Sequence, residues 1–176
     1  MKELIKAIDN DNLVKMKSLL EEGIDLSQLV IIGEEYELDE PDEIGILFYA
    51  IRTHASLEAI ELLLSYGIDI SQLDDNGIST LDTAIKFRRI DIIKLCIDRG
   101  FDLNSSSRRS GIKPLMLASC FGDTSIAQLL IDNGADINDK DKSGMSPKDY
   151  ARKLGQKKME EFLTKNGGVH LVYKEK

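Results

Sequence analysis

Aliphatic residues recur along the chain at the spacing of amphipathic helices, and each run ends shortly before a glycine. Leu19 and Leu20 precede Gly23, and a run from Leu95 to Ile97 precedes Gly100. Apolar positions three and four residues apart lie on one face of a helix. The pattern predicts five pairs of helices near 2–21, 45–65, 79–98, 113–132 and 146–164, and no strand.

These glycines give the chain an internal period. Four segments share Gly, a variable residue, Asp, an aliphatic residue and then Ser or Asn, and they begin at Gly23, Gly67, Gly100 and Gly134. Their spacings are 44, 33 and 34 residues. Glycine ends a helix in the left-handed conformation at no steric cost, so we predict a helix cap at each. A repeating period of this length indicates stacked helical repeats.

A small residue marks the first helix of each repeat. Ala7, Ala84 and Ala118 lie 16 residues before their glycines, and Ala50 lies 17 before Gly67. An alanine lets the first helices of neighbouring repeats approach closely, as dense packing requires. We place the extra residue before Gly67 in the helix turn around 53–56.

The alanines end four related segments: K-P-L-M-L-A at 113–118, S-T-L-D-T-A at 79–84, S-P-K-D-Y-A at 146–151 and G-I-L-F-Y-A at 45–50. With the glycine segments, they resemble the ankyrin repeat, which carries T-P-L-H-x-A, ends in G-A-D-I-N and has a period of about 33 residues. The tetratricopeptide repeat fits less well, because its aromatic and proline markers are absent. The resemblance implies an all-α solenoid of about five helix-turn-helix repeats with N- and C-terminal capping repeats.

The predicted organisation is one ankyrin-repeat domain over 1–168, followed by a C-terminal tail over 169–176. The repeats lie near 1–27, 44–72, 77–105, 111–138 and 144–166, and an acidic insertion occupies 28–43. The tail alternates apolar and polar residues for a few positions. It either adds a strand-like contact or frays, and we favour fraying.

None of these four six-residue segments keeps the histidine of the family's T-P-L-H-x-A motif. Phe48, Asp82, Met116 and Asp149 stand in its place. The family uses that group for hydrogen bonds between adjacent repeats. The departure therefore implies a less regular or less stable stack.

Charge and residue types narrow the function. The net charge of −8 disfavours a phosphate backbone as a partner, so we expect no nucleic acid, and no apolar segment approaches a membrane span. Cys96 and Cys120 lie in apolar helical patterns without a C-x-x-C partner, which predicts core thiols in a reducing cytoplasm. His54 and His170 have no ligand-spaced partner. We therefore expect no enzyme, no metal and no cofactor.

The acidic insertion is the first candidate binding element. It is open to two interpretations: a solvated loop, or a contact arm for a basic surface with Tyr36 as its aromatic anchor. A calcium site is disfavoured, because the loop lacks the alternating acids and central glycine of an EF-hand. The candidate residues are Glu34, Glu35, Tyr36, Glu37, Asp39, Glu40, Asp42 and Glu43.

The resemblance implies a second candidate, a concave face built from hairpin tips and first helices. Phe87 and Phe121 fall at equivalent positions in adjacent repeats, where they either form an aromatic ridge or pack inward between repeats. Arg108 and Arg109 suggest an anion contact, although we favour a flexible hairpin tip. The candidate residues on this face are Arg52, Asp75, Asn76, Lys86, Phe87, Arg109, Phe121 and Lys142; the same mapping places Lys153 and Leu154 in the last repeat.

The sequence therefore predicts a cytoplasmic, monomeric module that binds another protein, as a scaffold or by steric occlusion. One alternative is an immunity or inhibitor protein that neutralises a basic toxin or enzyme, as some small acidic bacterial ankyrin proteins do. Another is a regulatory subunit of an enzyme or transcription factor. The abundant isoleucine and absent tryptophan point to a microbial, AT-rich coding background, and the resemblance is to small, acidic ankyrin-repeat proteins of bacteria.

Overall fold

The computed structural model describes residues 1–32 and 42–173. Ten helices lie within these ranges, and they form the five predicted pairs. The chain divides into two compact units, Met1–Asp74 and Asp75–Lys176, which we call the N-terminal and the C-terminal unit. The pairs are α1 (Lys2–Asp9) with α2 (Leu13–Glu21), α3 (Ile46–Arg52) with α4 (Leu57–Ser65), α5 (Thr80–Lys86) with α6 (Ile90–Asp98), α7 (Pro114–Phe121) with α8 (Thr124–Asp132), and α9 (Pro147–Lys153) with α10 (Lys157–Lys165).

The N-terminal unit contains the first two repeats and a short β-hairpin. Strand β1 (Val30–Ile32) pairs antiparallel with β2 (Asp42–Ile44), and Val30 lies opposite Ile44. The prediction of a chain without strands is therefore wrong. Each strand has only three residues, too few to show the alternation by which a strand is recognised. Val30 is buried, so the hairpin is anchored in the core of this unit.

Side chains from the first repeat hold the second repeat in place. The Tyr49 hydroxyl donates to Asp9 Oδ1 at 2.6 Å, and the Ser56 backbone N–H donates to Asp11 Oδ1 at 3.0 Å. Four residues, 53–56, separate α3 from α4, whereas three separate α1 from α2. The extra residue predicted in this turn is thus confirmed.

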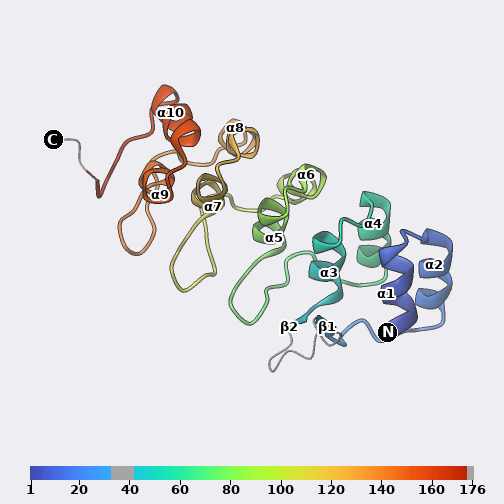
Figure 1. Ribbon diagram of the computed structural model, residues 1–176. Helices are drawn as coiled ribbons and strands as arrows, with labels where there is room; N and C mark the ends of the chain where they lie inside the picture. The colour runs from blue at the N-terminus through green and yellow to red at the C-terminus, as the bar shows by residue number, and fades with distance from the viewer. Residues whose placement is uncertain (33–41, 174–176) are drawn as a thin grey trace. The chain divides into compact units, whose positions relative to one another are not determined.

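In the C-terminal unit, the first helices of three repeats pack in a row. Helix α7 contacts both α5 and α9, while α8 packs against α7 and α10 packs against α9 (Figure 1). Ala84, Ala118 and Ala151 are fully buried in this row. The small residue predicted from the sequence therefore lies where neighbouring repeats meet.

The ends of the helices follow the sequence prediction. The four period-defining glycines each stand two residues after a helix and have φ between +79° and +97°, a region in which a side chain would be strained: Gly23, Gly67, Gly100 and Gly134. At the opposite ends, Ser79 and Ser146 cap α5 and α9, and Asp82 and Asp149 complete the reciprocal capping boxes.

The loops of the C-terminal unit also connect neighbouring repeats. The Lys142 backbone N–H donates to the Ser110 carbonyl at 3.2 Å, which joins the loop before α9 to the loop before α7. A Cβ atom added to Gly77 would lie 2.5 Å from the Ser107 carbonyl oxygen. The loop before α5 is therefore also in close contact with the next loop, the one before α7.

Candidate protein-binding surface

Three apolar side chains occupy equivalent positions at the ends of α5, α7 and α9. Phe87 is the C-cap of α5, Phe121 is the last residue of α7, and Leu154 is the C-cap of α9. Each follows a buried alanine by three residues. We call these three residues the ridge.

The ridge is accessible to solvent. Leu154 is 51% exposed and Phe121 37% exposed, whereas Phe87 is half-buried. The sequence left open whether Phe87 and Phe121 form an exposed ridge or pack inward between repeats. Phe121 is partly exposed, as a ridge requires, and Phe87 is intermediate between the two. The repeat mapping of the sequence already places Leu154 at the equivalent position of the last repeat, although the predicted aromatic ridge contained only the two phenylalanines.

Cations flank this ridge. Lys86 precedes Phe87 and places its Nζ 5.6 Å from the centre of the phenyl ring, and Lys153 precedes Leu154. Both lysines are exposed. The ridge and its surroundings therefore favour a partner segment that combines apolar side chains with negative charge.

The two units carry opposite net charges. Residues 1–74 contain five Lys and Arg against seventeen Asp and Glu, a net charge of −12. Residues 75–176 contain eighteen against fourteen, a net charge of +4, and the two values sum to the −8 of the chain. A partner that contacts both units therefore meets two surfaces of different electrostatic character.

The hairpin tips of the C-terminal unit bring two predicted residues together. Arg109 and Lys142 are both exposed, and the hydrogen bond from Lys142 N–H to the Ser110 carbonyl places their loops side by side. Arg108 behaves differently, because its Nε donates to Asp82 Oδ2 at 3.2 Å. The anion predicted for this arginine is thus a carboxylate of the same chain, and the tip is tied down rather than free.

The remaining predicted residues are scattered or lie beyond the described part. Arg52 ends α3 and is half-buried, Asp75 and Asn76 are exposed, and Glu43 is exposed on β2. Asp42 begins β2, and its backbone pairs with Ile32. Six members of the acidic insertion lie outside the described residues: Glu34, Glu35, Tyr36, Glu37, Asp39 and Glu40.

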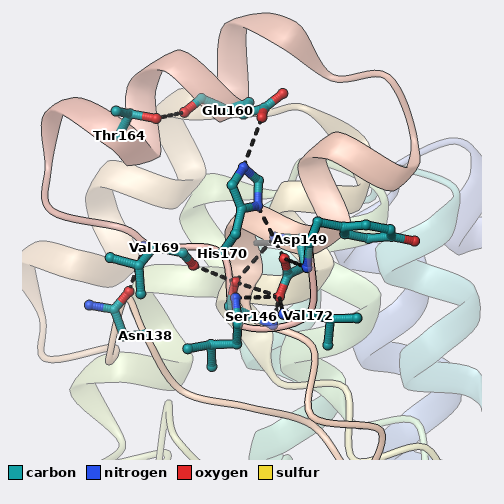
Figure 2. Close-up of polar contacts among 10 residues, drawn as sticks. Asn138, Ser146, Asp149, Glu160, Thr164, Val169, His170 and Val172 are labelled. Atoms are coloured by element: carbon teal, nitrogen blue, oxygen red, sulfur yellow. Dashed lines mark hydrogen bonds and ion pairs between the residues drawn. The ribbon is translucent and has the colours of Figure 1, made fainter. Parts of the chain in front are cut away.

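The tail makes specific contacts that the sequence analysis did not predict. The expectation of fraying is wrong for residues 169–173, because backbone N–H groups of Leu171, Val172 and Tyr173 donate to the Asp149 carboxylate at 3.0 to 3.2 Å (Figure 2). The contact is not a strand. Three amides converge on one side chain more than twenty residues away, and no local pattern in the sequence reveals such a contact.

These hydrogen bonds control the ionisation of Asp149. Burial alone would raise the pKa of this carboxyl, but the N–H donors of Ser146, Val172, Leu171 and Tyr173 outweigh it and bring the pKa to about 2. Asp149 is therefore a buried anion at any pH near neutrality.

The two cysteines lie in apolar surroundings. Burial raises the pKa of Cys96 to about 12 and that of Cys120 to about 11. A thiol attacks as its thiolate, so neither sulfur is activated as a nucleophile. This agrees with the prediction of core thiols.

A family model described as ankyrin repeats in three copies matches the chain over residues 4–107 and again over 101–174. The two matches together span nearly the whole sequence. The chain belongs to the ankyrin-repeat family.

Two curated proteins contain similar ankyrin-repeat segments. The E3 ubiquitin-protein ligase Ufd4 of Drosophila melanogaster is 34% identical over 106 residues, which are 60% of this chain and 4% of that protein. The putative ankyrin repeat protein R598 of Acanthamoeba polyphaga mimivirus is 31% identical over 123 residues, covering 61% of this chain and 39% of that protein. The chain thus spans well under half the length of each relative.

Ankyrin repeats are protein–protein interaction modules, and the structure shows how this one departs from the family pattern. The missing histidine predicted a less stable stack, because the family uses it for hydrogen bonds between repeats. Asp82, which stands in its place, still makes such a bond: it caps its own helix and accepts a hydrogen bond from Arg108 of the next repeat. Within the residues that the structure describes, no helix is long and apolar enough to cross a membrane.

Proposed function

We propose that this ankyrin-repeat protein binds a partner protein through the face of its C-terminal unit that carries the ridge and the hairpin tips, and that it does not catalyse a reaction. One observation supports this most: the three ridge residues recur at equivalent positions on helices that pack side by side. A row of partly exposed apolar side chains is unfavourable in water and becomes favourable when a partner covers it.

The partner's chemistry follows from the residues around the ridge. Lys86, Lys153, Arg109 and Lys142 are exposed and positive, so they favour a segment of the partner that combines apolar side chains with carboxylates. Complementary charge of this kind mainly speeds association and excludes wrong partners.

The acidic N-terminal unit supports a second candidate, an inhibitor or immunity protein that neutralises a basic toxin or enzyme. Its net charge of −12 includes the acidic insertion proposed as a contact arm. A basic partner would approach such a surface faster at low salt than at high salt. In both cases we propose a monomeric, cytoplasmic protein whose partner is a protein rather than nucleic acid or membrane.

Affinity purification from cells of the source organism, quantified by mass spectrometry, tests the main proposal. The bait is the full chain, compared with a ridge variant in which Phe87, Phe121 and Leu154 are all alanine. Ile90→Ala is the matched control, because Ile90 is 43% exposed but begins α6, a second helix of the same unit.

We expect the partner to be enriched with the wild-type and the Ile90 baits and to be lost with the ridge variant. A partner retained equally by all three baits contradicts the proposal. Replacing the carboxylates between Glu34 and Glu43 by amides distinguishes the second candidate from the first. The second candidate requires that binding depends on this insertion and weakens steeply as the salt concentration rises.

A further inference from the structure

Strand β1 presents two apolar side chains to solvent. Leu29, just before the strand, is 49% exposed and Ile31 is 46% exposed, whereas Val30 between them is buried. Successive side chains of an extended chain point to opposite faces, so Leu29 and Ile31 share the outer face while Val30 anchors the inner one. We call Leu29 and Ile31 the hairpin strip. Two aliphatic residues exposed side by side favour an apolar partner.

The backbone of β1 is available for pairing as well. Among the described residues the sheet has two strands, β1 and β2, so each strand has one neighbour. In an antiparallel pair, alternate residues direct their N–H and C=O groups away from the neighbouring strand. Beyond the hairpin, no backbone hydrogen bond joins residues 29–32 to another residue that the structure describes. The outer edge of β1 can therefore receive a further strand.

The charge around the hairpin strip is negative. Glu43 is exposed and lies opposite Ile31 in the ladder, so both side chains are on the same face. Residues 18–51, which include the hairpin, contain ten Asp and Glu and no Lys or Arg. An added strand next to β1 would lie two strand spacings, about 10 Å, from Glu43, which is about one Debye length and within reach of a lysine or arginine side chain. The charge therefore favours a cationic segment.

A second copy of this chain is a poor occupant of this edge. Pairing two β1 edges would bring together two N-terminal units, each with a net charge of −12. Like charges on neighbouring strands are destabilising. An extended segment with apolar and basic side chains on one face fits better, because its apolar groups cover the hairpin strip and its cations approach Glu43.

We propose that β1 is a docking edge for an extended, basic segment of a partner protein, which adds to the sheet as a third strand. Main-chain hydrogen bonds would supply part of the affinity, and side chains on the outer face would select the partner. Because β1 has only three residues, the hairpin strip and the negative charge must supply the rest. This surface goes beyond the ridge, and its basic occupant deepens the second candidate function, on which it rests.

The test is a nuclear magnetic resonance titration of the full chain with a synthetic probe peptide. In the probe, threonine alternates with valine and lysine in turn, so that valine and lysine share one face of an extended chain. A control peptide has the same sequence with every backbone nitrogen methylated, which keeps the charge and side chains but removes the N–H donors. We expect the probe to shift the amide resonances of residues 29–32, and the control to bind at least about fivefold more weakly.

Variants of the chain locate the contact. Leu29→Ser together with Ile31→Ser removes the hairpin strip, and we expect the dissociation constant of the probe to rise at least about fivefold. Val14→Ser is the matched control, because Val14 is 82% exposed in the same unit but lies on α2. It should leave the affinity nearly unchanged. Glu43→Lys should weaken binding of the probe and strengthen binding of the same peptide with glutamate in place of lysine.

The possible outcomes separate this docking edge from the candidate function on which it rests. Equal binding of the probe and the methylated peptide, or equal binding to the wild type and the strip variant, overturns strand addition but leaves a basic partner held by charge alone. A titration without shifts in the N-terminal unit contradicts both the docking edge and the basic partner. A free chain that sediments as a dimer, and as a monomer once the hairpin strip is removed, would show that a second copy occupies the edge and that the proposal is wrong.

Discussion

The side-chain oxygen of Asn104 accepts a hydrogen bond from the Asp136 backbone N–H at 2.7 Å, and the same side chain donates to the Gly134 carbonyl. One residue thereby links the ends of two consecutive repeats. We predict that Asn104→Ala lowers the free energy of unfolding by about 1–2 kcal/mol, because two hydrogen bonds are lost. Thermal unfolding followed by circular dichroism measures this change.

Ser71 provides the control for this prediction. It follows Gly67 by four residues, as Asn104 follows Gly100, but its hydroxyl donates to Asp69 in its own loop. Ser71→Ala should change stability by less than Asn104→Ala. Equal losses would mean that the link between repeats contributes nothing beyond the loop itself.

Gly77 and Gly144 form a matched pair in the loops before α5 and α9. Both have positive φ, +73° and +83°, so alanine at either costs about 1–2 kcal/mol of backbone strain. A Cβ at Gly77 would also lie 2.5 Å from the Ser107 carbonyl, whereas one at Gly144 meets nothing within 4 Å. Gly77→Ala should therefore lose at least about 1 kcal/mol more in urea unfolding than Gly144→Ala. A larger loss at Gly144 would contradict the close approach of the loops.

The ionisation of Asp149 makes the free energy of unfolding depend on pH in the acidic range. The pKa of Asp149 is about 2 in the folded chain, whereas an unperturbed aspartate has a pKa of about 3.9. A carboxyl with a lowered pKa stabilises the fold above its unfolded value, and this contribution disappears as pH falls through the folded value. We expect about 2 kcal/mol to be lost between roughly pH 4 and pH 2.

Asp149→Asn tests this assignment by the same urea titrations at several pH values. The variant should be less stable than the wild type at pH 6, and the difference should shrink toward pH 2. A difference that does not change with pH would show that the carboxylate charge is not what matters.

The two thiols should react slowly in the native protein. Their raised pKa values, about 12 for Cys96 and about 11 for Cys120, leave almost no thiolate at pH 8. Modification by a disulfide reagent should be much slower than for a free thiol and should become complete after denaturation. Fast reaction of either cysteine in the native state would contradict its burial.

Most of the fold follows from local signals. The four period-defining glycines each stand two residues after the second helix of a repeat, and the buried alanines recur within the first helices. The period and these helix ends could therefore be predicted directly from the sequence. Strand β1 escaped prediction because its three residues, Val30–Ile32, show no alternation and pair across an insertion rather than a tight turn.

The candidate surface was only partly predictable. Phe87 and Phe121 stand out by their aromatic rings, whereas Leu154 is ordinary except for its position in the repeat. For the tail, the sequence left open a strand-like contact or fraying, and neither describes the observed contact. The order of the tail depends on Asp149, a side chain that its amides reach only after folding. Repetition reveals what the repeats have in common, but not a contact that one segment alone makes.

Hydrogen-exchange mass spectrometry of the complex with the purified partner tests the central claim most directly. Partner binding through the C-terminal unit predicts slower exchange in the peptides that contain Phe87, Phe121 and Leu154, and in the loops of Arg109 and Lys142. Exchange in α6 and α8, away from the ridge, should change little. Protection confined to residues outside the ridge and these loops would contradict the account.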